Sequence, residues 1–118
     1  YSADQDYEAG TVVKLGGSAE VTQTTGFNDA NVFGVVSTNP AYLMNSEAEG
    51  LPVALTGRVP CKVEGRIKKG ERLVSGSKPG FAKAVGNNDY DMRCIIGRAL
   101  TNKDTFDDGV VEVVVGVK

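Results

Sequence analysis

Valine and glycine together limit this chain to a β-sheet fold. Seventeen valines against three isoleucines, with eight threonines, favour extended strands, because side chains branched at Cβ lose rotamer freedom in a helix. Fifteen glycines interrupt the chain every few residues and supply turns between short strands. No window carries an apolar stripe of helical period over the length of a helix. The sequence therefore predicts an all-β domain.

Eight short segments have the composition of strands. They are residues 11–15, 19–24, 32–37, 53–63, 72–75, 81–85, 94–100 and 110–117. Strands separated by glycine-rich turns at this spacing indicate a compact β-barrel or β-sandwich. With 118 residues, we expect residues 1–118 to fold as a single β domain. The chain begins at Tyr1 rather than at a methionine, so we expect this domain to be part of a longer protein.

The longest predicted strand covers residues 53–63. Its apolar side chains stand at odd positions: Val53, Leu55, Val59, Cys61 and Val63. A period of two buries one face of a strand. Pro60 lacks the N–H that a central strand donates, so it predicts a sheet edge or a bulge. Residues 32–37, by contrast, are apolar enough to be buried on both faces.

The two halves of the chain resemble each other at an offset of about 60 residues. Residues 8–13, 33–36 and 53–57 align with residues 68–73, 96–99 and 112–116, at offsets of 60, 63 and 59. Two copies of one β unit bury their faces against each other. We therefore predict two pseudo-repeats in a compact pseudo-two-fold barrel. The alternative is a chance alignment of two halves that are both rich in valine and glycine.

Charge and composition exclude several classes of function. Thirteen Lys and Arg against fifteen Asp and Glu give a net charge of −2, with both signs scattered. No basic stripe is present, so we expect no nucleic-acid partner. The absence of histidine removes the commonest general base and metal ligand. Apolar runs are far too short for a membrane span, so we expect no membrane insertion.

Four segments are interpreted as turns or loops. Gly16-Gly17-Ser18 is not followed by a helix or by Lys-Ser/Thr, so it predicts a hairpin turn and no phosphate-binding loop. Residues 63–72 carry four cations and two anions, too little positive charge for a phosphate surface, and predict a solvated hairpin tip. Residues 40–50 predict a loop, and residues 87–91 a turn-rich insert.

No side-chain group has the spacing of a catalytic, cofactor or metal site. Carboxylates gather at the start of the chain and near its end, in both places without the spacing of a calcium loop: Asp4, Asp6 and Glu8, then Asp104, Asp107 and Asp108. The nucleophiles Ser2, Ser37, Cys61 and Cys94 have no oriented base nominated by spacing. We interpret Cys61 and Cys94 as buried thiols in a reducing compartment, with one disulfide as the alternative.

Two blocks of sequence resemble a module of tailed-phage virion proteins. Residues 34–42 read Gly-Val-Val-Ser-Thr-Asn-Pro-Ala-Tyr, and residues 53–63 read Val-Ala-Leu-Thr-Gly-Arg-Val-Pro-Cys-Lys-Val, followed by Ile-Lys-Lys-Gly at 67–70. This module lies at or near the C-terminus of fibre, appendage and other structural proteins, notably in phages of marine cyanobacteria. It is also similar to the autocleaving intramolecular chaperone domain of phage pre-neck appendages, which is classed with the glutamic peptidases. The resemblance covers residues 7–117.

The resemblance implies a domain of a longer fibrous virion protein, at the end of a tail fibre or appendage. Such a domain promotes trimerisation and assembly or caps the fibre, with other virion proteins as partners. It is located in the virion and assembled in the host cytoplasm. The candidate self-association strand is the one around Gly57, Val59, Pro60 and Val63, because Pro60 marks an edge. Replacing Val59 and Val63 with aspartate is expected to abolish association.

Two alternatives stay open at this point. One is a capsid-decoration or receptor-contact module, which binds a partner surface instead of aligning its own chains. The other is an autoprotease. In the autocleaving relatives a Ser-Asp-x-x-x-Glu-like cluster precedes the first strand, and Ser2, Asp4 and Glu8 echo it with different residues between them. No catalytic role is transferred to them, so self-cleavage would use residues upstream of Tyr1, and we expect this chain to be no enzyme and to need no cofactor or metal.

Overall fold

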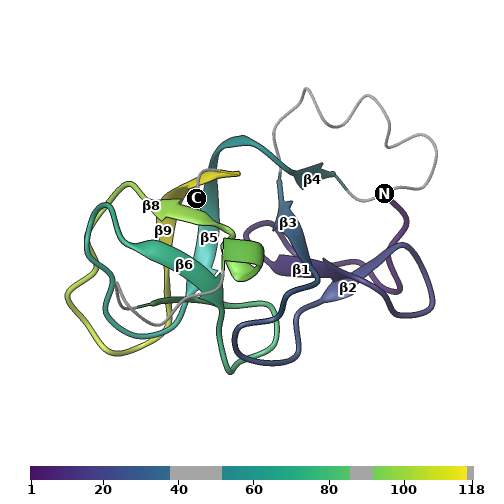
Figure 1. Ribbon diagram of the computed structural model, residues 1–118, viewed down its shortest axis with the longest axis horizontal. Helices are drawn as coiled ribbons and strands as arrows, with labels where there is room; N and C mark the ends of the chain where they lie inside the picture. The colour runs from purple at the N-terminus through teal and green to yellow at the C-terminus, as the bar shows by residue number, and fades with distance from the viewer. Residues whose placement is uncertain (38–51, 86–91, 117–118) are drawn as a thin grey trace.

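The computed structural model describes residues 1–37, 52–85 and 92–116, and this part of the chain is almost entirely β-structure (Figure 1). Its strands are β1 (Val12–Leu15), β2 (Val21–Gln23), β3 (Val32–Val36), β4 (Val53–Ala54), β5 (Gly57–Val63), β6 (Arg72–Ser75), β7 (Ala82–Ala84), β8 (Gly97–Ala99) and β9 (Gly109–Val115). A single 3₁₀ turn, η2 (Met92–Cys94), is the helical element of these described ranges. The predicted all-β fold is confirmed.

The strands form two sheets that lie side by side in Figure 1. The first sheet has the order β2-β1-β3-β4, with every neighbouring pair antiparallel. The second is a closed barrel in the order β5-β7-β6-β8-β9. Within it, β5 pairs with β9 along its whole length and meets β7 in parallel at one residue pair, Val63 and Ala82. That parallel pair closes the barrel.

The strand predicted over residues 53–63 is in fact two strands in different sheets. β4 ends at Ala54 and β5 begins at Gly57, and the bend between them carries the chain from the first sheet into the barrel. Gly57 has a φ of +91°, which glycine adopts without a Cβ clash. The prediction that Leu55 is buried with the other odd-numbered residues is wrong, because Leu55 lies in this bend and is 37% exposed.

The predicted pseudo-repeat is present in the strand pairing. The first sheet joins its strands in the order β2-β1-β3-β4, and the barrel joins β7-β6-β8-β9 in the same order. The register is also the same: Val13 lies opposite Gly34 in the first sheet, and Leu73 lies opposite Gly97 in the barrel. Instead of sharing one pseudo-two-fold barrel, however, the two copies form an open sheet and a closed barrel.

The last strand of each copy corrects the predicted offset by one residue. Ala54 lies opposite Val35 in the first sheet, and Val114 lies opposite Arg98 in the barrel. Because residues 35 and 98 are equivalent, Ala54 corresponds to Val114 at an offset of 60, and the predicted offset of 59 is wrong. The sequence comparison is misled here by a run of valines, in which a shift of one position changes little.

Backbone hydrogen bonds repeat in the same way. The N–H of Gly10 donates to the carbonyl of Val36 at 2.9 Å, and the N–H of Gly70 donates to the carbonyl of Ala99 at 2.8 Å. Both glycines have positive φ, +91° and +90°, a conformation that side chains with a Cβ rarely adopt. Each copy of the repeat therefore begins with the same left-handed glycine turn.

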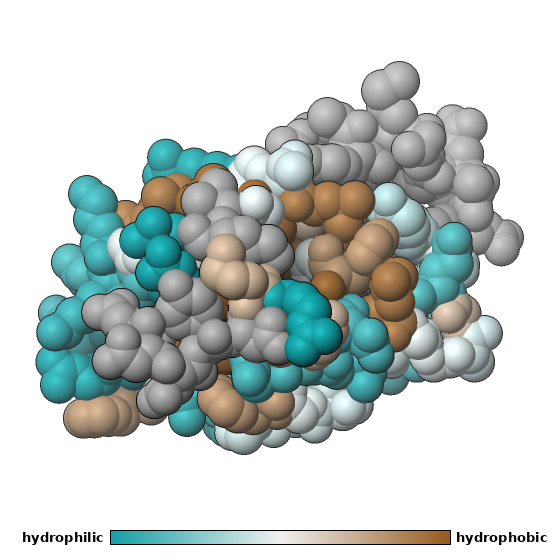
Figure 2. Space-filling model, in the orientation of Figure 1, coloured by the Kyte–Doolittle hydropathy of each residue, from teal (hydrophilic) through white to brown (hydrophobic). Residues whose placement is uncertain are grey.

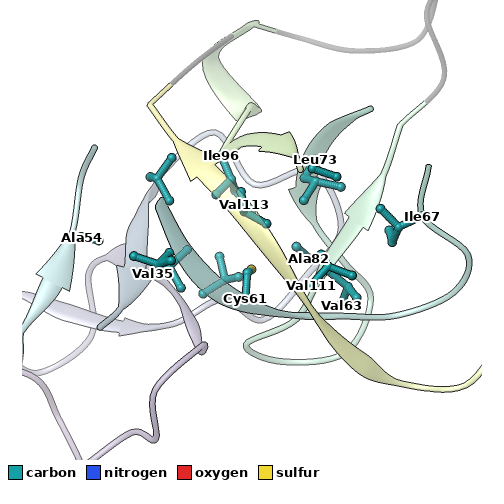
Figure 3. Close-up of a cluster of buried hydrophobic side chains, with 14 residues drawn as sticks. Val35, Ala54, Cys61, Val63, Ile67, Leu73, Ala82, Ile96, Val111 and Val113 are labelled. Atoms are coloured by element: carbon teal, nitrogen blue, oxygen red, sulfur yellow. The ribbon is translucent and has the colours of Figure 1, made fainter. Parts of the chain in front are cut away.

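The two copies pack through one face of the first sheet. Three residues of this face, Val12, Val35 and Ala54, belong to the same buried cluster as the barrel interior, and Figure 3 shows Val35 beside Cys61 of β5. Their neighbours along each strand form a second cluster on the opposite face: Val13, Val36 and Val53. The prediction that residues 32–37 are buried on both faces is thus confirmed for β3, where Val35 and Val36 point to different cores.

The barrel differs from the first sheet at the equivalent positions of its outer face. Where the first sheet has Val12 and Val35, the barrel has Arg72 and Arg98, which are both partly exposed. The Arg98 guanidinium donates through Nε to the carbonyl of Gly70 at 2.9 Å. Valine stands where one copy packs against the other, and arginine stands where the second copy meets solvent.

The segment 63–72 is a crossover, and the predicted hairpin tip is wrong. β5 and β6 are not neighbours in the barrel, because β7 lies between them. The segment is held on its way by Ile67, which is fully buried and forms an antiparallel bridge with Lys103. The turn at Gly16-Gly17, in contrast, does join the paired strands β1 and β2, as predicted. Residues 40–50 and 87–91 lie outside the described residues.

Both cysteines are free and buried, as the sequence predicts. Cys61 lies in the core shared by the two copies, and Cys94 lies in a smaller cluster beside Ile95. The Cys94 Sγ donates to the carbonyl of Asn28 at 3.2 Å. Cys94 ends the 3₁₀ turn, so the strand predicted from residue 94 begins only at Gly97.

Burial of Cys61 makes the stability of the protein fall at alkaline pH. Burial raises the pKa of its thiol from 9.0 to about 12, so the folded chain keeps a proton that the unfolded chain releases. The free energy of unfolding is therefore expected to decrease above pH 9, by about 1.4 kcal/mol per pH unit from this thiol. Urea titrations between pH 8 and about 11 measure how the free energy of unfolding changes with pH. The Cys61→Ala variant should lack the decrease that comes from this thiol. An unchanged slope in Cys61→Ala would contradict the assignment.

Candidate interaction surface

The candidate self-association strand is β5, and its two faces have different environments. Val59 is 3% exposed and Val63 is fully buried, both inside the barrel core. Gly57 and Pro60 are exposed. The side chains of Val59 and Val63 are therefore not available to a second chain in the folded protein. Association through this strand stays a prediction, and it would involve the outward positions and not the two valines.

Pro60 lies on β5 where the missing N–H costs no ladder bond. The N–H of Lys62 donates to the carbonyl of Gly10 at 2.9 Å, away from β9. Because alternate residues of a strand point their N–H groups the same way, the nitrogen of Pro60 also faces away from β9. The pairing of β5 with β9 continues through Pro60 and Glu112 without a shift of register. Pro60 therefore causes no bulge, and β5 is not an edge strand of an open sheet, because the closed barrel places it between β9 and β7.

The first sheet exposes apolar side chains whose counterparts in the barrel are buried. Leu55 is 37% exposed, whereas Val115, its equivalent at an offset of 60, is 3% exposed. Tyr1 is 45% exposed and packs edge-on against Phe33, with 4.9 Å between the ring centroids. Figure 2 shows brown apolar atoms over this part of the first sheet. We call Tyr1, Phe33 and Leu55 the open face of the first sheet.

A shallow cavity adjoins the open face. It has a volume of about 150 Å³ and lies between the first sheet and the end of β9. Phe33 and Leu55 line it from the first sheet, and Ile95 and Gly116 line it from the other side. The described residues of its walls include no carboxylate and one cation, Arg93, so its chemistry suits packing of an apolar group better than catalysis.

The residues that echo the autocleaving relatives are not brought together. Ser2 and Glu20 bind each other: the Ser2 N–H donates to Oε1 at 2.8 Å, and the Glu20 N–H donates to the Ser2 Oγ at 3.1 Å. The Asp4 carboxylate accepts from the Tyr7 hydroxyl at 2.6 Å and from Thr22, and these bonds lower the pKa of Asp4. Each group has a structural partner, so the arrangement provides no nucleophile with an oriented base.

Glu8 and Asp108 also have structural partners. Glu8 forms an ion pair with Lys62, and Asp108 forms one with Lys78. The Lys103 ammonium donates to the carbonyls of Gly65 and Thr105, both at 2.8 Å, and so ties its own loop to the crossover. Within the described ranges no three His, Cys, Asp or Glu side chains are grouped so that they could hold a metal ion.

The open face is the feature that sequence reasoning missed. Aligning the two copies places Val12 and Val35 against Arg72 and Arg98, and this difference marks the face through which the first sheet packs against the barrel, which is the opposite face. The alignment does not show which strands complete each sheet. That depends on β5, which follows the first copy in the sequence and yet pairs within the second.

Comparisons with known proteins add no relative. A scan against protein-family models, a search of curated proteins and a search of solved structures each find no match to this chain. Across the described residues, no helix has the length and apolar character needed to cross a membrane.

Proposed function

We propose that this chain is a non-catalytic structural module of a phage virion, located at the end of a tail fibre or appendage. There it associates as a trimer, which promotes assembly of the fibre or caps it. The sequence support is the resemblance of residues 34–42 and 53–63 to a module of fibre and appendage proteins. A structural protein of this kind has to present a surface to other chains rather than a reactive group.

The observation that carries this proposal is the open face of the first sheet. Within the described residues this sheet ends at β4, and it leaves Tyr1 45% and Leu55 37% exposed, whereas the barrel buries Val115, the counterpart of Leu55. Apolar side chains gathered at a sheet edge favour association, because contact with another chain removes them from water. The described nucleophiles favour no reaction: the Cys61 thiol is buried with a raised pKa, and Ser2 is bonded to Glu20.

The solution mass of the chain tests the proposal. Light scattering over a range of concentrations is expected to give three times the 12.4 kDa of one chain. Leu55→Glu places a charge on the open face and is expected to return the mass to that of a monomer. Phe106→Glu is the matched control, because Phe106 is 79% exposed on a different loop, and it should leave the trimer intact.

Two outcomes would count against parts of this proposal. A mass of one chain at every concentration would overturn self-association and would favour a decoration module that binds another protein. A trimer that Leu55→Glu does not weaken would exclude the open face as its interface. Circular dichroism on each variant shows whether a lost trimer reflects a lost fold.

A further inference from the structure

A cleft lies on the barrel between the crossover 63–72 and the loop 100–108, which precedes β9. It has a volume of about 260 Å³. Figure 1 shows the loop before β9 at the end of the barrel away from the first sheet, so this cleft is separate from the open face. The described residues that line it come from both segments: Arg66, Ile67, Lys68, Glu71, Lys103 and Asp104.

The two walls of this cleft are tied to each other at three places. Ile67 and Lys103 exchange main-chain hydrogen bonds of 2.9 and 2.8 Å, and Ile67 is fully buried beneath them. The Lys69 N–H donates to Oδ1 of Asn102 at 2.8 Å, and the Lys103 ammonium donates to the carbonyl of Gly65 at 2.8 Å. The walls are therefore fixed in advance, and a ligand would not have to order them.

The charges that remain available in the cleft are balanced. An ammonium group has three N–H donors, and that of Lys103 donates to three main-chain carbonyls, those of Gly65, Thr105 and Asp107. The other charged residues among the described lining are the cations Arg66 and Lys68 and the carboxylates Glu71 and Asp104. Glu71 is held in place, because its Oε1 accepts from the Lys68 N–H at 2.6 Å.

This mixture of groups selects for hydroxyls. An anion such as phosphate would meet the two carboxylates, and an apolar group would have to displace water from four charged groups. A hydroxyl both donates and accepts hydrogen bonds, so it can donate to a carboxylate and accept from a guanidinium or an ammonium. A ligand that carries several hydroxyls on a small frame satisfies both kinds of charged group at once.

An exposed aromatic ring stands beside the cleft. Phe106 is 79% exposed, two residues after Asp104, and the Arg66 guanidinium lies over its ring at 5.4 Å from the centroid. Since Arg66 also lines the cleft, it connects the ring to the charged groups. The face of an aromatic ring is negative and attracts groups with partial positive charge, including the C–H groups on one face of a sugar ring.

We propose that this cleft binds a neutral pyranose sugar, as the terminal residue of a glycan. Its hydroxyls donate to the carboxylates of Glu71 and Asp104 and accept from Arg66 and Lys68, and its C–H face lies against Phe106. The volume suits one sugar ring, because drug-sized ligands occupy pockets of about 300–1,000 Å³. The inference goes beyond the proposed function, which uses the open face for association.

Nuclear magnetic resonance titration of the isotope-labelled protein tests this site. The probes are the methyl glycosides of glucose, galactose, mannose and N-acetylglucosamine. A ligand of one ring is expected to bind with a Kd of about 1 mM or weaker, so each is added up to about 50 mM. At least one of them should shift the amide resonances of Lys68, Lys69, Asp104 and Phe106, and should leave the amide of Val53 in the first sheet unchanged.

Two variants and a matched control assign the binding to the cleft. Phe106→Ala removes the ring and is expected to weaken binding by about threefold to tenfold. Asp104→Ala removes a carboxylate and is expected to weaken it by about tenfold. Phe27→Ala is the control, because the Phe27 ring is also exposed, at 53%, and also lies beneath a cation, 5.5 Å from the Lys83 ammonium, but is not part of this cleft. It should bind with the Kd of the parent protein.

Inorganic phosphate and cyclohexanol, titrated over the same range, separate sugar binding from its alternatives. Phosphate that shifts the cleft amides when no glycoside does would show an anion site, and cyclohexanol that binds as tightly as the glycosides would show adsorption to the ring alone. Either result would overturn the inference, as would no shift with any of the four glycosides or an equal loss of binding in Phe27→Ala.

The test does not depend on the oligomeric state. A monomer that binds a glycoside in this cleft would support the inference and count against self-association. A trimer that binds none of the glycosides would retain the proposed function and remove this inference.

Discussion

Val59→Asp and Val63→Asp are each expected to unfold the protein and not merely to separate its chains. Both residues line the barrel core, at 3% and 0% exposure, with no cation in that cluster to pair with a new carboxylate. Burying an unpaired charge costs several kcal/mol or more, and proteins of this size are stable by only about 5–15 kcal/mol. Loss of the β-sheet circular dichroism spectrum and collapse of amide resonance dispersion would show the effect.

Arg58→Asp is the matched control on the same strand. The Arg58 side chain is 68% exposed and lies 3.4 Å from Glu112, so its replacement removes a surface ion pair worth at most about 1 kcal/mol. This variant should remain folded. A folded Val59→Asp variant that is only monomeric would contradict the inward orientation of Val59. From the sequence, the aspartate substitutions were expected to test association. In the structure they test the stability of the barrel core instead.

Local features of the fold could be predicted from the sequence, because valine and glycine act locally. β6 has the predicted bounds, and β1 and β3 differ from prediction by one residue at one end. The repeat was also visible, since the left-handed turns at Gly10 and Gly70 need glycine in both copies. These features depend on the conformation of a few adjacent residues, which is the information that composition and spacing carry.

Long-range pairing could not be predicted in the same way. Residues 53–63 keep their alternation through the bend at Leu55, so nothing in the pattern shows that β4 and β5 belong to different sheets. Pro60 does not show that β5 belongs to a closed barrel, nor which face of that strand lines a core. The candidate site shifted for this reason from the side chains of β5 to the open face beside β4.

Gly97→Ala is expected to destabilise the protein by about 3 kcal/mol or more, because a Cβ at this position has no room. It would overlap the main-chain carbonyl of Val114 in β9, which a backbone paired in the barrel cannot move aside. Gly34 is its equivalent in the first sheet, where a Cβ would lie 2.5 Å from the carbonyl oxygen of Ala54. Gly34→Ala should therefore also lower the free energy of unfolding. Urea denaturation of each variant measures both changes.

Substitution of two other glycines distinguishes a loss of stability caused by steric overlap from one caused by backbone strain. Gly26 has open space for a Cβ and no positive φ, so Gly26→Ala should be neutral or stabilising by about 0.5 kcal/mol, through a lower entropy of the unfolded chain. Gly57 also has open space but a φ of +91°, so Gly57→Ala should cost about 1 kcal/mol from strain alone. If Gly97→Ala and Gly34→Ala lost no more stability than Gly57→Ala, close approach of the strands would not be the reason for glycine at these positions. A shared loss of stability in Gly97→Ala and Gly34→Ala would show that both copies of the repeat need glycine where the same two strands approach each other, once in the closed barrel and once in the first sheet.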